Sequence, residues 1–452
     1  MDDNHDTDTL LALVSSLLII APPDAVVMLD ALIECNGDVA ATAQLLNQAA
    51  NSRKRKRTNL DSWLLKSPNQ KPVKIPTDSE HSKSDKDTAV PSSSRASMNS
   101  QTMDLMPILR APPSKKNTAL PQLPPLLLSN PNLVAQNTPC TLHLSVLPPK
   151  LACRLFYAML RASEGWQRNK WWLFDRLVES PHRTAFFARK DDGVDSNESW
   201  QQAAQFWYNG RMTEAPDQFP TAMEEACIIV ESIVNQELKH RNRFPLEWAG
   251  DDVDQTWRAN VAASNCYEGS KEAVGFHSDQ MTYLGPYPTI ASLSLGTERI
   301  FRLREVIPTD QLGVRRARTF NIPLPHNSLT IMHASCQEGF KHSVPPQRAI
   351  DLYRPAFPEH PGAEIQASNC RINITFRFYR PDFRPPTIPR CKCGIPTVLR
   401  ADMKNRGDAR TDRYWWSCYA GAQNEGKGCN YWKLLDMKAE GRGPCLCDKQ
   451  QA

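Results

Sequence analysis

The alternation of apolar and polar side chains is strictest between positions 371 and 378 of this 452-residue chain. Isoleucine and phenylalanine take every second place there, and the places between them are held by Arg371, Asn373, Thr375 and Arg377. A period of two predicts a β-strand, so the four polar side chains should share one face. Two arginines, an amide and a hydroxyl on one strand face make a suitable cradle for a dicarboxylate.

Other periodic segments predict the elements around this strand. Shorter alternating runs at 291–295 and 329–333 predict two further strands. Helical periodicity predicts one helix that opens near Pro149 and runs to Leu160, and another over 221–241. Helices and strands together indicate a domain of the α+β type within residues 141–388.

Residues 8–50 are predicted to form a small all-α module. Three short apolar runs are separated by Pro22-Pro23-Asp24 and by a turn at 35–38, in which Asp38 is placed as a helix cap. With its terminal di-leucine at 45–46, the module resembles the CUE/UBA class, which implies ubiquitin as a partner. The alternative is a generic helical hairpin that packs on the rest of the protein. The longest apolar run, 10–20, is too short to span a bilayer.

Composition and charge divide the remainder of the chain. Proline accounts for 36 residues, about 8% against a usual ~5%, and residues 51–140 are predicted to be a disordered linker rich in Ser, Pro, Lys and Asp. Five consecutive cations at 53–57 indicate nuclear localisation or a nucleic-acid arm, with a merely soluble linker as the alternative. The acidic residues before the first apolar run exclude a signal peptide. We therefore expect a nuclear protein without a membrane partner, in which the thirteen cysteines do not form a disulfide framework.

A histidine and an aspartate two residues apart, His277 and Asp279, suit one metal ion at the end of a strand. A second histidine from downstream would complete a 2-His-1-carboxylate set, which leaves open positions and is typical of non-haem Fe(II) oxygenases. Four later histidines compete for that place: His326, His333, His342 and His360. His333 ends an apolar strand and is the strongest rival of His342.

Four motifs together resemble the AlkB family over residues 141–388. They are Asn265-x-Tyr267, His277-Ser-Asp279, His342-Ser-Val-Pro, and Arg371-x-Asn373-x-Thr-x-Arg377. The resemblance implies a double-stranded β-helix of jelly-roll type, with Fe(II) held by His277, Asp279 and His342. It also implies 2-oxoglutarate as co-substrate, contacted by Asn265, Tyr267, Arg371, Asn373 and Arg377.

The same resemblance implies oxidative dealkylation of N-alkylated nucleic-acid bases, as in DNA repair, with release of succinate, CO₂ and formaldehyde. The segments 181–187 and 206–210 fall where AlkB-like proteins place a nucleotide-recognition lid, with Arg183, Phe187 and Tyr208 as candidate substrate contacts. Aromatic rings suit the stacking of a flipped base, and ordinary packing is the alternative for any single ring. Repair members usually carry an acidic residue just after the His-x-Asp pair, where this chain has Gln280. RNA or another alkylated base therefore stays an alternative substrate. A 2-oxoglutarate oxygenase that acts on protein and a non-catalytic adaptor that links ubiquitin to damaged nucleic acid are two further interpretations.

Four cysteines after the composition shift at Pro389 have the order of a closed zinc site: Cys391, Cys393, Cys418 and Cys429. With the aromatic residues around them, residues 389–440 resemble a GRF-type zinc finger, which is associated with single-stranded nucleic acid. Residues 389–443 contain eleven Lys/Arg and six Asp/Glu, so cations are available for phosphates and rings for bases. Residues 441–452 are predicted to be a tail, with Cys445 and Cys447 either a spare ligand pair or without a role.

Overall fold

The computed structural model describes residues 14, 17–18, 25–35, 38–48, 123–173, 176–189, 207–250, 257–311, 314–405 and 413–449. The chain divides into two compact units, Met1–Pro121 and Gln122–Ala452. The cation cluster at 53–57 and the predicted linker as far as residue 122 lie outside the described residues. No helix of the described residues is long and apolar enough to cross a membrane.

The first unit contains the predicted second and third helices of the N-terminal module. Helix α2 spans Ala25–Glu34, and residues 39–48 are also helical. Asp38 caps the latter helix, because its Oδ1 accepts a hydrogen bond from the backbone N–H of Ala41 at 3.0 Å. The predicted cap is therefore confirmed, whereas the first predicted helix lies almost wholly outside the described residues.

The second unit is built on two β-sheets whose strands pair mostly in the antiparallel direction. The larger has the strand order β2-β14-β11-β16-β9-β5-β8, and the smaller β1-β13-β12-β15-β10. The strands of the larger sheet are β2 (Cys140–Leu144), β14 (Ser328–Met332), β11 (Ile290–Gly296), β16 (Cys370–Arg377), β9 (Val261–Glu268), β5 (Arg183–Ala188) and β8 (Asp217–Gln218). Those of the smaller are β1 (Leu126–Leu127), β13 (Thr319–Leu324), β12 (Arg299–Glu305), β15 (Phe340–Val344) and β10 (Val274–His277). This two-sheet arrangement is the jelly-roll-like fold that the sequence predicts.

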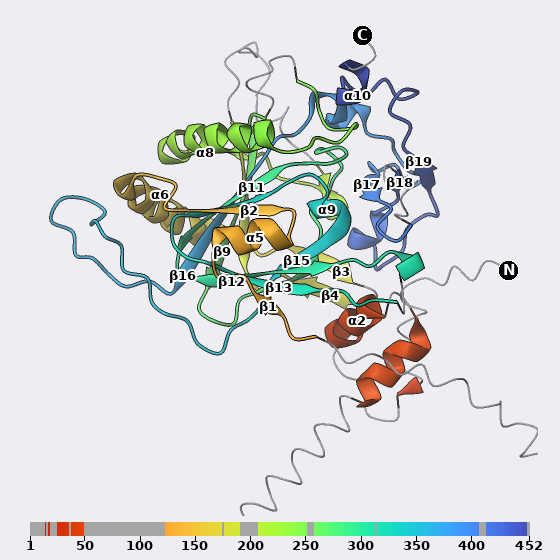
Figure 1. The fold of residues 1–452 in the computed structure, drawn as a ribbon, viewed down its shortest axis with the longest axis horizontal. Helices are drawn as coiled ribbons and strands as arrows, with labels where there is room; N and C mark the ends of the chain where they lie inside the picture. Colours follow the sequence, from red (N-terminus) through yellow and green to blue (C-terminus); the bar gives the residue numbers. More distant parts are fainter. Residues whose placement is uncertain are drawn as a thin grey trace, which may run out of the picture. The chain divides into compact units, whose positions relative to one another are not determined.

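Two helices cover one face of the larger sheet (Figure 1). They are α6 (Pro149–Ala162) and α8 (Thr221–His240), both close to their predicted bounds. Phe156 of α6 and Val230 of α8 are fully buried in the same cluster as Ile372 and Leu293 of the sheet. Burial of each such side chain stabilises the fold by roughly 1.5–3 kcal/mol. The two helices therefore hold this face of the sheet firmly in place.

The opposite face of the larger sheet carries the polar side chains of β16. The strand pairs with β11 and β9, so that Asn373 lies opposite Ser294 on one neighbour and Asn265 on the other. Side chains directly opposite one another in a sheet share a face. The predicted alternation is confirmed, and the polar residues of three adjacent strands are gathered on one surface.

The segment 123–140, predicted as the end of the linker, belongs to the folded unit. β1 pairs in parallel with β13, and α5 (Pro131–Asn137) follows it. Leu128 is 1% exposed and Val134 is fully buried. Prolines and asparagines made this stretch resemble a linker, but Asn130 caps α5 by accepting from the Leu133 N–H. The predicted boundary at 140 is therefore wrong, and the folded unit begins earlier.

A small three-stranded sheet formed by β17 (Val398–Ala401), β18 (Tyr414–Ser417) and β19 (Trp432–Leu434) packs against the same unit. Tyr414 and Trp416 are buried in one cluster with Phe383 and Met281. The predicted tail packs there too, up to α10 (Leu446–Lys449): the Arg442 guanidinium lies 5.0 Å from the Trp416 ring centroid and Cys445 is 1% exposed. Residues 441–449 are thus part of the fold and not a free tail.

Candidate metal and co-substrate site

Adjacent strands of the smaller sheet bring two histidines together. His277 ends β10 and lies directly opposite His342 on β15. Their rings are 4.3 Å apart between centroids. Asp279 follows two residues after His277, and its Oδ1 lies 3.9 Å from His277 Nε2 and 3.4 Å from His342 Nε2. All three ligand atoms lie within 4.8 Å of one another, close enough to share one metal ion.

The two carboxylate oxygens of Asp279 have different partners. Oδ1 faces the histidines, whereas Oδ2 accepts hydrogen bonds from Nε and Nη2 of Arg377 at 3.0 and 2.7 Å. Burial alone would raise the pKa of Asp279, but Arg377 and the two histidines hold that pKa well below its usual range. The Asp279 N–H also donates to Gln337 Oε1 at 2.8 Å. Asp279 is therefore ionised at neutral pH and fixed in orientation.

His277 is oriented by its own strand. Its Nδ1 donates to the carbonyl oxygen of Gly275 at 2.8 Å, which leaves the Nε2 lone pair directed at the cluster. Burial and the neighbouring His342 lower the pKa of His277 to about 4, although the side chain keeps 39% of its accessible surface. The ring is neutral at pH 7, which is the form that binds metal.

A buried arginine on the same strand as Arg377 has donors to spare. Arg371 is 2% exposed, and its Nη2 donates to Ser294 Oγ at 2.9 Å. Its Nε and Nη1 have no hydrogen-bond partner among the described residues. Burial lowers the pKa of Arg371 to about 10, so it remains a cation at neutral pH. Buried cationic donors without partners are costly, and a carboxylate that binds there would satisfy them.

Aromatic and amide groups form the wall around Arg371. The guanidinium lies 5.3 Å from the ring centroid of Tyr267, and His182 stacks on that ring with 4.8 Å between the centroids. Asn265 accepts from Thr184 Oγ1 at 2.8 Å. Asn373 donates from its amide nitrogen to Ser292 Oγ and to the Leu293 carbonyl. His182 and Thr184 lie within the segment 181–187 that was predicted to belong to a nucleotide-recognition lid. Neither was singled out, because neither belongs to a periodic or spaced motif.

The family model of the 2OG-Fe(II) oxygenase superfamily matches residues 163–377. These residues form an AlkB-like oxygenase domain. The Alpha-ketoglutarate-dependent dioxygenase alkB homolog 3 of Bos taurus is 35% identical over 129 residues, which cover 28% of this chain and 38% of that protein. The DNA oxidative demethylase ALKBH2 of Arabidopsis thaliana is 31% identical over 135 residues, 26% of this chain and 38% of that protein. The chain therefore matches well under half the length of these curated relatives. The solved structure of OsALKBH1 shares 14% identity at a TM-score of 0.32, and the match covers 54% of this chain and 99% of that one.

The residues of the oxygenase domain fit the Fe(II) and 2-oxoglutarate that its superfamily implies. The triad offers two imidazole nitrogens and one carboxylate oxygen, the set that leaves open coordination positions for co-substrate and O₂. The rival histidines lie elsewhere: His333 Nε2 bonds to Thr141 Oγ1, and His326 Nε2 to Tyr353 Oη. His360 is exposed. Of the four candidates from the sequence, His342 alone joins His277 and Asp279 in the cluster.

Of the three predicted lid residues, only Tyr208 lies at the site of the oxygenase domain. Its phenol interacts electrostatically with Arg377 and Asp279, and burial raises its pKa to about 12. Phe187 points into the core beneath the sheet, where it is 2% exposed and meets Trp166 edge to face.

Arg183 lies on that same side of β5 and pairs with Glu268 at 3.0 Å. Alternation along β5 is the reason, because residues 183, 185 and 187 share the face that packs on the core. Phe186, on the opposite face, lies 5.5 Å from Tyr208 between ring centroids. Of the two neighbouring phenylalanines, Phe186 is the one that contacts Tyr208. A substrate-binding role for Arg183 and Phe187 stays a prediction.

Gln280, the neutral residue after Asp279, is hydrogen-bonded to the residue before Tyr208. Gln280 donates from Nε2 to the Trp207 carbonyl at 3.2 Å and to Thr282 Oγ1 at 3.1 Å. The Trp207 N–H in turn donates to Tyr283 Oη at 2.9 Å. The site therefore presents an amide where an acidic side chain would carry charge.

A second cluster lies outside the oxygenase domain. Cys391, Cys393, Cys418 and Cys429 place their sulfur atoms within 4.8 Å of one another. The thirteen cysteines of the chain are all free thiols in the structure. Cys445 and Cys447 do not belong to the cluster, since Cys445 is buried against Arg380. Four thiols at this spacing fit a structural zinc ion.

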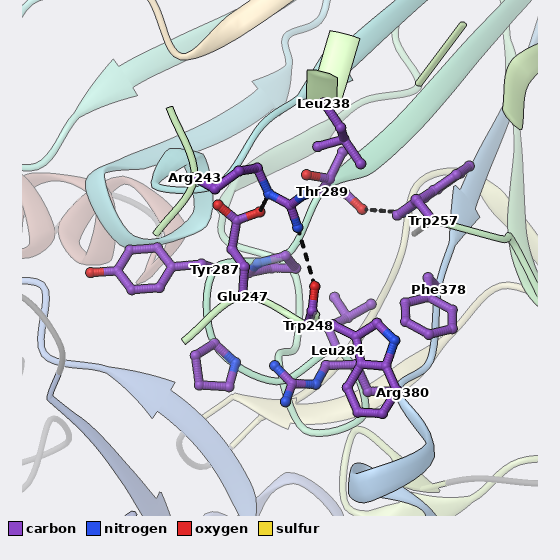
Figure 2. Close-up of a pocket in the computed structure, with 12 residues that line it drawn as sticks. Leu238, Arg243, Glu247, Trp248, Trp257, Leu284, Tyr287, Thr289, Phe378 and Arg380 are labelled. Atoms are coloured by element: carbon purple, nitrogen blue, oxygen red, sulfur yellow. Dashed lines mark hydrogen bonds and ion pairs between the residues drawn. The ribbon is translucent and has the colours of Figure 1, made fainter. Parts of the chain in front are cut away.

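A hollow at the far end of α8 contains none of the site residues (Figure 2). Two of its charged groups bind each other, since Arg243 donates to Glu247 at 2.6 Å. Arg243 also donates to the Trp248 carbonyl at 3.2 Å, and Arg380 pairs with Asp382 at 2.7 Å. Trp257 Nε1 donates to the Thr289 carbonyl at 2.9 Å. The polar groups of this hollow are thus used within the fold.

Proposed function

We propose that this protein is an Fe(II)/2-oxoglutarate-dependent dioxygenase that removes alkyl groups from nitrogen atoms of nucleic-acid bases. The observation that carries the proposal is the convergence of His277, Asp279 and His342 beside the unsatisfied donors of Arg371, within an AlkB-like domain. AlkB homologues are among the curated relatives. The products would be succinate, CO₂, formaldehyde and the bare base.

Each group of the site has a separate task in this proposal. Fe(II), when bound by the triad, supplies the oxidative chemistry. Arg371 binds the distal carboxylate of 2-oxoglutarate, because its open donors are buried cations with no other partner among the described residues. Arg377 keeps Asp279 ionised and turned so that Oδ1 faces the metal position. Asn265 and Tyr267 close the co-substrate pocket from β9.

Tyr208 and Phe186 suit the capture of a base. Their rings meet edge to face, and the Tyr208 phenol is close enough to Asp279 to interact with it electrostatically. A base taken out of its stack is held by such rings. Gln280 offers hydrogen bonds but no negative charge, which disfavours strict dependence on a cationic alkylated base.

The decisive experiment measures formaldehyde from the Fe(II)-loaded full-length protein with single-stranded DNA and RNA oligonucleotides that carry one N-methylated base. Turnover of 2-oxoglutarate without any oligonucleotide serves as a reference. Formaldehyde that depends on the methyl group supports dealkylation. Release from methylated peptides only would favour a protein substrate, and the absence of all 2-oxoglutarate turnover would favour the non-catalytic adaptor.

We further propose that the cysteine cluster binds zinc in a GRF-type finger that contacts single-stranded nucleic acid. Trp432 supports this, because it is 59% exposed on β19 next to the cation Lys433. The ubiquitin-binding role of the CUE-like module and the nuclear localisation remain proposals that rest on the di-leucine at 45–46 and the cations at 53–57. Pull-down with mono-ubiquitin and imaging of a variant without the cations would test them.

A further inference from the structure

The hairpin that carries Tyr208 is a short element with one end tied to the metal site. It consists of β6 (Trp207–Tyr208) and β7 (Arg211–Met212), joined by Asn209 and Gly210 with φ values of 47° and 74°. An Asn-Gly turn with positive φ at both residues is the preferred two-residue hairpin connection. The Trp207 carbonyl accepts from Gln280, the residue next to Asp279.

The tip of this hairpin is tied to the cysteine cluster. The short helix η5 (Ala420–Gln423) begins two residues after Cys418. Gln423 Nε2 donates to the Asn209 carbonyl at 2.7 Å and to the Lys170 carbonyl at 3.4 Å. A Cβ on Gly210 would lie 2.7 Å from the Tyr419 carbonyl oxygen. The turn therefore presses its backbone against the segment that follows Cys418.

That segment is in turn held by the cluster. Cys418 Sγ accepts from the N–H groups of Ala420 and Cys429, both at 3.4 Å. A Cβ on Gly421 would lie 2.6 Å from the Gly426 carbonyl oxygen. The loop thus folds closely round the Cys418 sulfur atom, so its shape depends on the position of that atom.

We infer that the four-cysteine module positions the Tyr208 hairpin over the metal site, with Gln423 as a positioning residue. The path runs from Cys418 through Gln423 and Asn209 to Tyr208, and then through Trp207 and Gln280 to the loop of Asp279. The module therefore has a role in base recognition apart from any contact of its own with nucleic acid. The expected effect on substrate binding rests on the proposed function, whereas the hydrogen-bonded link between the module and the hairpin does not.

The test compares full-length Gln423→Ala with Glu425→Gln. Glu425 lies in the same loop but pairs only with Lys427 in the described structure, so it is a matched control. Loss of the two Gln423 hydrogen bonds should raise the rate of amide hydrogen exchange in residues 207–212 about five- to tenfold. For a methylated oligonucleotide, KM should rise by a similar factor, with kcat, the KM for the co-substrate and the metal content of the cluster unchanged. The control should match the parent protein.

Gly210→Ala supplies a second variant, because the added Cβ meets the Tyr419 carbonyl from the other side of the contact. It should likewise raise the KM for the methylated oligonucleotide and leave kcat unchanged. Unchanged hydrogen exchange in 207–212 for Gln423→Ala would overturn the inference. So would an equal rise in the KM for the co-substrate, because the defect would then be general. Increased exchange in a protein that releases no formaldehyde would support the link and count against the proposed function alone.

Discussion

Arg377 donates two hydrogen bonds to a single oxygen of Asp279, and the other oxygen of that carboxylate faces His277 and His342. Arg377, one of the four polar residues predicted to hold a dicarboxylate, is therefore already hydrogen-bonded to Asp279, a candidate metal ligand. We therefore propose that Arg371 binds the co-substrate and that Arg377 orients the carboxylate at the metal position. The two arginines, six positions apart on one strand, should respond differently to substitution.

Arg371→Lys should raise the KM for the co-substrate about ten- to a hundredfold, because lysine cannot present a planar fork to a carboxylate. Fe(II) affinity should stay near that of the parent protein, since Arg371 contacts Ser294 and not the triad. Kinetics with varied 2-oxoglutarate and titration with Fe(II) measure the two effects. An unchanged KM would remove Arg371 from the co-substrate site.

Arg377→Lys should weaken Fe(II) binding, because a lysine cannot reproduce the paired Nε and Nη2 contacts that turn Asp279. We expect a loss of about tenfold in affinity, measured by metal titration without co-substrate. The opposite pattern, with normal metal affinity and a raised 2-oxoglutarate requirement, would exchange the roles of the two arginines.

If His277, Asp279 and His342 bind the metal ion, three alanine variants should be inactive and one control variant should be active. Alanine at His277, Asp279 or His342 should abolish 2-oxoglutarate turnover while the thermal midpoint stays within a few degrees, since the sheets have their own core. His333→Ala should retain turnover, because this ring bonds to Thr141 and lies outside the cluster. Activity in His342→Ala together with its loss in His333→Ala would reject the ligand set.

The neighbouring phenylalanines of β5 should separate recognition from stability. Phe187→Ala removes a buried ring and should lower the free energy of unfolding by about 3–5 kcal/mol. Phe186→Ala should change stability much less but raise the KM for the methylated oligonucleotide, because this ring faces Tyr208. Urea unfolding and steady-state kinetics measure the pair, and a reversed result would mean that the strand faces are exchanged.

Trp432 should contribute to the affinity for single-stranded nucleic acid. Base stacking on an aromatic ring is worth roughly 1–3 kcal/mol, so Trp432→Ala in the full-length protein should weaken binding by about fivefold to a hundredfold. Trp432→Tyr should restore most of the affinity, because a ring is retained. Fluorescence anisotropy at low salt gives both constants, and equal affinity of all three proteins would leave the exposed ring without this role.

Local patterns were sufficient for much of the site. Strict alternation placed Arg371 and Arg377 on one face, and spacing selected His277 and Asp279, because both features depend only on backbone geometry. The face of β5 was not predictable, since a two-residue period does not say which face meets the core. Only the pairing of Thr184 with Asn265 settles it.

The extent of the folded unit also required tertiary contacts. Residues 123–140 have the composition of a linker, yet Leu128 and Val134 fill the core between the sheets. The finger was predicted as a separate module, but Tyr414 donates to Glu338 at 3.1 Å, and Trp416 lies beside Phe383. These contacts join segments far apart in sequence, and no periodicity within either segment announces them.

Dealkylation itself is decided by mass spectrometry of a single-stranded oligonucleotide with one N-methylated base, incubated with the full-length protein, Fe(II), O₂ and 2-oxoglutarate. We expect loss of the methyl group, with one formaldehyde and one succinate for each demethylated base, and no change of mass with Asp279→Ala. Consumption of 2-oxoglutarate to succinate while every methylated DNA and RNA strand keeps its mass would contradict the proposed function.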